Sequence, residues 1–367
     1  MALSVNQIQA ACHERFKDEL NALKAFRASG GRVMGYTCHM FPSAVAAGLG
    51  FWPLRLMCGA SSDAESSGEK VVRADVCPHV KCLLGNVSED RGLHAGVDLW
   101  LGLYTCDQMK RGLQCLSEDL GRRVHPLQLP STQTREAAEY YAHQVRRVVK
   151  DIEALDGLGF DAARARQWHG DRNEAAKVLA EAAYSLRVSP VDLHAMFHLF
   201  FIARPEGMAG FFRKIIGESR GFDAGKSVVL AGSPLAHEDT GILEELEARG
   251  ISIIPLNCTG LNAAEGIGPV SDDDLPGSLA IQAFQAPACI RARPNAAVYE
   301  RIAAVLRSTG ASGLIVKSLK FCDLWYTERE RLKRSFGVPV LVFDSDYAEG
   351  GKGRLFSRID AFLEMLR

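Results

Sequence analysis

Four cysteines stand where predicted β-strands end. They close four apolar segments: Cys38 in GRVMGYTC, Cys106 in VDLWLGLYTC, Cys258 in ISIIPLNC and Cys322 in GLIVKSLKFC. Cys106 and Cys322 are each followed by an aspartate and a helix-like run, so a helix dipole favours their thiolate forms. Because the carboxyl ends of parallel strands line the crevice in which ligands bind, these thiols are expected to meet there. Gathered thiolates are typical ligands of an iron–sulfur cluster or of a soft metal.

The spacing of the cysteines alone does not decide between a metal centre and a structural role. The chain has ten cysteines, but it has no CxxC pair and no ferredoxin-type run. A single free cysteine is most often a small buried hydrophobic residue. The residue pattern by itself therefore favours a metal site and a set of buried thiols about equally, with a closed tetrahedral zinc site as the weakest alternative.

Motifs for other chemistries are missing or incomplete. The segment VVLAGSPLAH lacks the GxGxxG fingerprint, and GxxxxGK[ST] does not occur, so neither NAD nor ATP is expected in a standard loop. Ser233, His237 and Asp239 lack a GxSxG elbow around the serine, which favours an ordinary helix start. His194 and His198 are one helical turn apart, but without HExxH they indicate helix packing rather than zinc.

Composition excludes several classes of protein. With 367 residues, 47% of them hydrophobic, the chain can bury the cores of two or more domains. A net charge of −1 gives no general attraction to nucleic acid or to an anionic membrane, so neither is an expected partner. The N-terminal segment lacks the apolar stretch of a signal peptide, and no apolar run reaches the roughly 18 residues of a membrane span. We expect a cytoplasmic protein whose thiols stay reduced.

Alternation of strand and helix patterns predicts an α/β fold. We expect an N-terminal α/β lobe with a leading helix over residues 1–133, a helical bridge over 134–225, and a C-terminal α/β lobe over 226–367. The predicted elements include a strand at Leu54–Met57 and a loop at Ser61–Glu69. The prediction is two Rossmann-like (flavodoxin-like) lobes with parallel sheets that face one another across a cleft lined by cysteines.

Several segments together resemble a known superfamily. GYTCHMFPSAVAAGLGFWPLRL, DVCPHVKCLLG, YTCDQMKRG, GSPLAHED and LKFCDLWYTERERLKRSFGVPVLVFDSDYAEGG occur in the order found in the 2-hydroxyacyl-CoA dehydratase and benzoyl-CoA reductase superfamily. The resemblance implies an oxygen-sensitive iron–sulfur centre between two lobes. It also implies a separate ATP-hydrolysing iron–sulfur activator as electron donor, and a homodimer or a heterodimer with a subunit of the same fold.

The resemblance also implies the cluster ligands. In dehydratase-type subunits three cysteines hold one 4Fe–4S cubane, and they correspond here to Cys77, Cys106 and Cys322. Cysteines also stand at three further motif positions, as in the superfamily branch with a double-cubane 8Fe–9S cluster, which we favour. These further positions are Cys38, Cys258 and Cys289. Cys82, where a serine is usual, is an alternative ligand in place of Cys77.

Three functions remain open at this point. The favoured one is a reductase that transfers low-potential electrons through a double-cubane cluster to a small substrate. The second is a subunit of a 2-hydroxyacyl-CoA dehydratase or benzoyl-CoA reductase, which acts on an acyl-CoA through a ketyl radical. The third is a non-catalytic electron-transfer subunit. Ser43-Ala44 after Pro42 and Leu324 after the FCD motif depart from the family pattern, so no CoA-binding residue is carried over.

Overall fold

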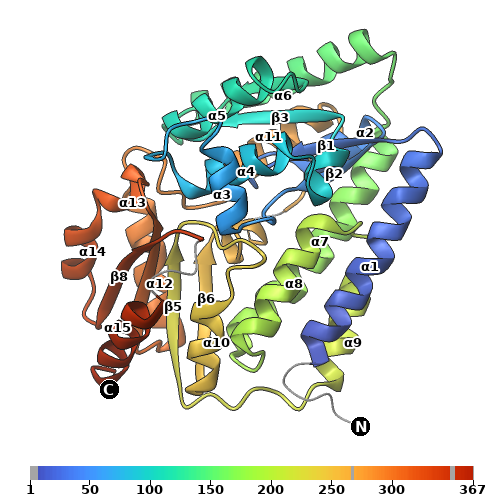
Figure 1. The fold of residues 1–367 in the computed structure, drawn as a ribbon. Helices are drawn as coiled ribbons and strands as arrows, with labels where there is room; N and C mark the ends of the chain where they lie inside the picture. The colour runs from blue at the N-terminus through green and yellow to red at the C-terminus, as the bar shows by residue number, and fades with distance from the viewer. Residues whose placement is uncertain (1–6, 266–267, 348–351, 367) are drawn as a thin grey trace.

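The computed structural model describes residues 7–265, 268–347 and 352–366, and these residues form two four-stranded parallel sheets. The strand orders are β2-β1-β3-β4 and β6-β5-β7-β8, so each lobe repeats the order of a flavodoxin-like sheet. Figure 1 shows the N-terminal sheet at the top, the C-terminal sheet at the lower left, and long helices along the right side. The prediction of two Rossmann-like lobes is confirmed.

The N-terminal sheet carries short crossover helices. Its central strands β1 and β3 are almost entirely buried, as expected for a parallel sheet that is covered on both faces. The elements are β1 (Arg32–Tyr36), α2 (Ser43–Gly48), β2 (Phe51–Arg55), α3 (Ser62–Gly68), α4 (Pro78–Ser88), the 3-10 helix η1 (Gly92–Gly96), β3 (Leu99–Tyr104), α5 (Asp107–Glu118) and β4 (Val124–Gln128).

Two predictions in this lobe were wrong in detail. The second strand is β2 rather than Leu54–Met57; it contains Pro53, which is tolerated because β2 is an edge strand. The segment Ser61–Glu69 contains helix α3 instead of a loop. The Ser61 side chain caps this helix by accepting the backbone N–H of Ala64, and a side chain at Gly68 would collide with the backbone of α4. A run of small polar residues therefore allowed two helices to pack closely.

The C-terminal sheet follows the same plan with longer strands. Its strands β5, β6 and β7 are buried over nearly their whole length. The elements are β5 (Lys226–Gly232), α10 (Gly241–Ala248), β6 (Ile251–Asn257), the 3-10 helix η2 (Leu261–Ala263), α11 (Leu275–Gln285), α12 (Ala296–Thr309), β7 (Gly313–Leu319), α13 (Asp323–Tyr326), α14 (Arg329–Ser335), β8 (Val340–Ser345) and α15 (Lys352–Glu364).

Helices between and before the sheets hold the lobes together. Every residue of α8 is buried, and α1 packs along it (Figure 1). Helix α11 follows β6 in sequence but packs on α6 in the core of the N-terminal lobe, where Phe284 stacks on Tyr141 with ring centroids 5.3 Å apart. These helices are α1 (Gln7–Ala28), α6 (Arg135–Asp156), α7 (Ala162–Ser185), α8 (Pro190–Ile202) and α9 (Met208–Glu218).

Candidate metal centre

Six cysteines line one cavity between the lobes, with a volume of about 180 Å³. Four of them follow strands β1, β3, β6 and β7, so they come from the carboxyl ends of both sheets. The other two precede α4 and lie between α11 and α12. We call this the six-cysteine cavity; its thiols are Cys38, Cys77, Cys106, Cys258, Cys289 and Cys322.

The six thiols fall into two groups of three. In the first triad, burial raises the pKa of Cys77 to about 12, and the neighbouring Cys322 and Cys106 add to the effect. In the second triad, burial raises the pKa of Cys38 to about 12, with contributions from Cys289 and Cys258. Because the thiols of Cys77 and Cys38 are protonated near neutral pH, binding of a metal centre to them would release protons.

One amide side chain connects the first triad across the lobes. Gln108, in the first turn of α5, accepts a hydrogen bond from the backbone N–H of Cys77. Its amide nitrogen donates to the carbonyl of Phe321, the residue before Cys322, at 2.6 Å. The Cys106 sulfur accepts the backbone N–H of Met109 at 3.4 Å and so caps α5. Gln108 therefore links the backbone segments of Cys77 and Cys322 across the lobes, and it lies on the helix that the Cys106 sulfur caps.

Two buried arginines give the cavity an uncompensated positive charge. Arg55 is 1% exposed; its Nε donates to the carbonyl of Thr37 at 3.0 Å, and its guanidinium lies 4.3 Å from the ring centre of Phe201. Neither Nη atom of Arg55 has a hydrogen-bond partner. Arg291 is 7% exposed and donates to the carbonyl of Pro130. Neither arginine has an ion pair, and no Asp or Glu lines this cavity among the described residues.

These features fit a polynuclear anionic group better than a single ion. Among the described residues, no three His, Cys, Asp or Glu side chains lie close enough together to bind one metal ion. Six thiols around a cavity of this size suit a larger cluster, whose thiolates and sulfides carry negative charge. Two buried cations with open donors would compensate that charge, since an unpaired buried charge is otherwise costly.

The remaining cysteines lie outside the cavity lining. The Cys82 thiol donates to the carbonyl of Ser61 at 3.7 Å, and Cys82 is not among the residues that line the cavity. Cys12 and Cys115 are buried, and Cys58 lines a different cavity. Ligation by Cys82 stays a prediction from the sequence.

The other motifs have structural roles. The Ser233 hydroxyl accepts the backbone N–H of Leu319 at 3.0 Å, and Asp239 forms an ion pair with Lys317, so no hydrolase relay is assembled. The rings of His194 and His198 are 4.2 Å apart within buried helix α8. These two histidines pack in the core, as the sequence indicates.

Sequence reasoning missed the polar residues around the thiols. Arg55 ends the apolar strand β2, at the same sheet edge as the cysteines, and this lone charge was a signal that could have been used. His39 and His79 also line the cavity. Burial, reinforced by Arg55, holds the pKa of His39 well below its ordinary value and lowers that of His79 to about 4. Both imidazoles are therefore neutral hydrogen-bonding groups beside the thiols.

Comparison with known proteins places this geometry in context. The family model described as 2-hydroxyglutaryl-CoA dehydratase, D-component, matches residues 38–366. YjiM of Escherichia coli (strain K12), provisionally named as a dehydratase subunit, is 22% identical over 354 residues, which cover 91% of each chain. No helix among the described residues has the length and apolar character that a membrane span needs.

Proposed function

The chain belongs to the 2-hydroxyglutaryl-CoA dehydratase D-component family, and from that premise we propose that it is an oxygen-sensitive iron–sulfur reductase with a double-cubane cluster. Family membership makes it a dehydratase-type subunit. The observation that carries the finer proposal is the pair of cysteine triads that line one cavity together with two uncompensated arginines.

Each triad would hold one half of the cluster. Bound there, the cluster would supply one-electron reduction at low potential. The first triad would use Cys77, Cys106 and Cys322, and the second would use Cys38, Cys258 and Cys289. The rest of the lining is largely apolar and includes Leu256 and Trp325, which would limit the access of water to a bound cluster.

The polar residues of the cavity have two tasks. Arg55 and Arg291 compensate negative charge where no carboxylate competes for them, which makes addition of an electron to the site less costly. His39 and His79 stay neutral and offer hydrogen bonds to a small substrate beside the thiols. Gln108 keeps the loops of Cys77 and Cys322 in register across the lobes.

Electrons would come from a partner protein. The chain has no phosphate-binding loop, which is consistent with a separate ATP-hydrolysing iron–sulfur activator as donor. Cys106 is the one exposed member of the six thiols and marks the side from which the activator would approach. A companion of the same fold, either a second copy or a different subunit, completes the proposed assembly.

A second candidate function rests on the first triad alone. Gln108 joins the backbone of Cys77 to that of Phe321, next to Cys322, and the Cys106 sulfur caps the helix that carries Gln108. A single 4Fe–4S cluster on Cys77, Cys106 and Cys322 would make the chain a dehydratase-type subunit that removes the hydroxyl group of an acyl thioester. The second triad would then have no metal to bind.

Iron and acid-labile sulfide per chain, measured on protein purified without oxygen, separate these functions. About eight irons support the double-cubane proposal, and about four support the single cubane. Cys258→Ser should lower the iron content only in the first case, while Cys115→Ser serves as a control in both. Absence of iron after anaerobic reconstitution would refute both, and a loaded cluster that turns over no substrate would indicate an electron-transfer subunit.

A further inference from the structure

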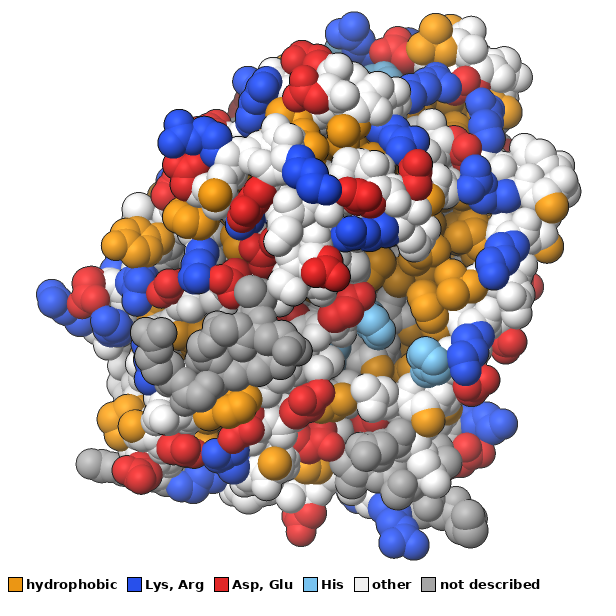
Figure 2. All heavy atoms as spheres, in the orientation of Figure 1, with side chains coloured by type: hydrophobic (Ala, Val, Ile, Leu, Met, Phe, Trp, Pro, Cys, Tyr) orange, Lys and Arg blue, Asp and Glu red, His pale blue; other side chains and the backbone are white. Residues whose placement is uncertain are grey.

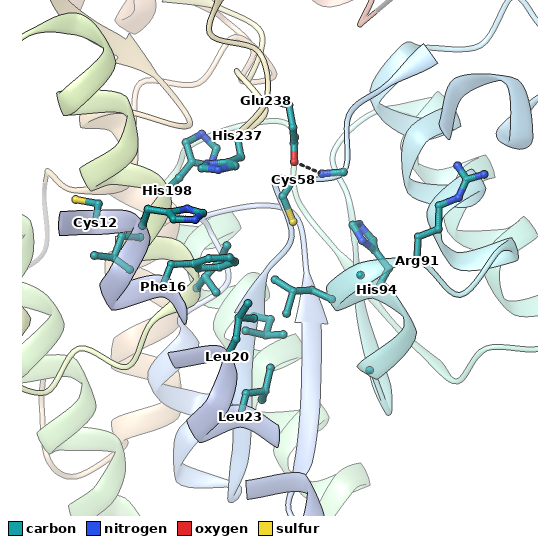
Figure 3. A pocket seen from close by; sticks show the side chains of 18 of the residues that line it. Cys12, Phe16, Leu20, Leu23, Cys58, Arg91, His94, His198, His237 and Glu238 are labelled. Carbon is teal, nitrogen blue, oxygen red and sulfur yellow. Dashed lines mark hydrogen bonds between the residues drawn. The ribbon is translucent and has the colours of Figure 1, made fainter. Parts of the chain in front are cut away.

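A second, larger cavity lies beside helix α1, and we call it the α1 cavity. Its volume of about 890 Å³ is within the roughly 300–1,000 Å³ typical of small-molecule sites, and it shares no lining residue with the six-cysteine cavity. Figure 2 shows a hollow lined by apolar side chains on this face of the molecule. In Figure 3, Phe16, Leu20 and Leu23 of α1 form one wall, and His94 and Arg91 lie across from them.

The α1 cavity is elongated. The residues of α1 that line it run from Gln9 to Arg27, one face of the helix about 27 Å long at 1.5 Å per residue. Most of the lining is apolar, with Leu54 and Ile202 facing α1. A long apolar body fits such a cavity better than a compact polar one.

A buried imidazole in this cavity lacks a partner. His94 is 5% exposed, and its ring stacks on Trp100 with centroids 6.2 Å apart. Burial lowers the pKa of His94 to about 4, so the ring is neutral. It makes no side-chain hydrogen bond with any residue that the structure describes, and it points into the cavity (Figure 3). The ring therefore has unused hydrogen-bonding capacity facing the cavity, where a ligand can reach it.

The charges at the cavity favour an anion. Lys24 and Arg91 line it without an ion pair to any described residue, and the Arg91 guanidinium donates one hydrogen bond to the Ser67 hydroxyl at 3.2 Å. Glu238 is the only carboxylate among the described lining residues, and it already accepts the backbone N–H groups of Gly59 at 2.9 Å and Ala60 at 3.2 Å. The cavity therefore combines an apolar body with a positive rim.

We propose that the α1 cavity binds an amphiphilic organic anion, an aliphatic chain that ends in one acidic group. The chain lies along Phe16, Leu20 and Leu23, and the acidic group meets Arg91 and the N–H of His94. The site is separate from the proposed cluster and does not depend on it.

Calorimetric titration of the full-length protein with monomeric dodecanoate tests this site. We expect saturable binding of one molecule per chain, and no binding of dodecyltrimethylammonium, which has the same chain with a cationic head. Arg91→Gln should weaken dodecanoate binding by about tenfold through loss of one charge-assisted hydrogen bond. Leu20→Trp places a bulkier side chain in the path of the alkyl chain and should weaken binding. His94→Phe keeps the stacking on Trp100 but removes the donor, so it should also weaken binding.

Lys17→Gln is the matched control, because Lys17 is exposed on α1, pairs with Glu14 and does not line the cavity. Equal binding of the anionic and cationic probes, or unchanged binding in Arg91→Gln and Leu20→Trp, would overturn the proposal. So would a change of oligomeric state in Leu20→Trp without dodecanoate binding, which would make α1 an interface between copies. Sedimentation with phosphatidylglycerol vesicles without binding of monomeric dodecanoate would assign the surface to a membrane instead.

Discussion

The six-cysteine cavity and the α1 cavity share the exit of strand β2, but one gathers thiols and buried arginines while the other presents a long apolar wall. Arg55 and Met57 line the first, whereas Leu54 and Cys58 line the second. Side chains alternate across a strand, so one short segment supplies a cation to the thiols and an apolar wall to the other site. In this segment the charged position, Arg55, faces the thiols, and the apolar position before it, Leu54, faces the α1 cavity.

A pair of loops keeps the two cavities apart. The backbone N–H of His237 donates to the carbonyl of Met57 at 2.8 Å, and the Glu238 carboxylate accepts the N–H groups of Gly59 and Ala60. These contacts join the loop after β2 to the loop after β5. They connect the lobes and separate the thiols from the apolar cavity.

The largest expected effect is on the iron content, which should depend on a thiol of the six-cysteine cavity and not on a thiol of the α1 cavity. Cys322→Ser removes a proposed ligand of the first triad and should cost at least half of the iron of the proposed cluster, because a serine hydroxyl is a poor replacement for a thiolate. Cys12→Ser, at a buried thiol that lines the α1 cavity, should leave the iron content unchanged. Iron and sulfide analysis of both variants measures this; equal loss in the two would contradict the assignment.

The next prediction tests the charge of Arg55 at the end of β2, the strand whose exit lines both cavities. Arg55→Met should make the midpoint potential of the proposed cluster more negative by roughly 60 mV, a tenfold change for a one-electron couple, because a buried cation no longer compensates the added electron. Arg55→Lys keeps the charge and should shift the potential less. Redox titration followed by EPR gives both values, and identical potentials would show that Arg55 has no electrostatic role.

The boundary between the cavities can be weakened directly. Glu238→Ala removes the acceptor of two backbone N–H groups and should lower the free energy of unfolding by about 1–2 kcal/mol. Urea denaturation of the metal-free protein measures this free energy of unfolding. Glu206→Ala, at an exposed residue without an ion pair among the described residues, should change that free energy by less than about 0.5 kcal/mol. A loss of equal size in the two variants would argue against this role of Glu238.

The last prediction concerns the pH dependence of stability at the wall of the α1 cavity. Asp192 in α8 accepts the backbone N–H of Gln9 at 2.8 Å, and burial raises its pKa to about 7. The folded state thus keeps a proton that the unfolded state loses near pH 4, and stability falls as the pH rises from about 4 to 7. Asp192→Asn should remove this part of the pH dependence in thermal unfolding at pH 5 and pH 8. An unchanged difference in stability between pH 5 and pH 8 would mean that groups other than Asp192 cause the pH dependence.

The strand patterns in the sequence predicted the positions of the four cysteines that follow strands, but not those of the other two. A buried parallel strand is a continuous apolar run, so its end is visible in the sequence, and Cys38, Cys106, Cys258 and Cys322 could be placed at one edge. Cys77 and Cys289 follow no strand, and only the family resemblance indicated them. Their approach to the other thiols depends on tertiary packing that no local pattern encodes.

The α1 cavity was not predictable from local sequence. Its walls come from α1, the end of β2, η1 and α8, which are brought together only by the packing of α1 on α8. His94 lies in a short 3-10 helix and resembles any loop histidine in the sequence. A missing hydrogen-bond partner is a property of the folded surroundings, so it becomes visible only in the structure.

Helix α11 has a consequence for how the chain can be divided. It belongs to the second half of the sequence, yet it completes the core of the first lobe through Phe284 on Tyr141 and through the ion pair of Asp274 with Arg146. A gene cut at residue 225 would therefore yield an N-terminal fragment with an exposed apolar face. The two fragments would have to be produced together and reassociate, so the lobes are interlocked parts of one folding unit rather than exchangeable modules.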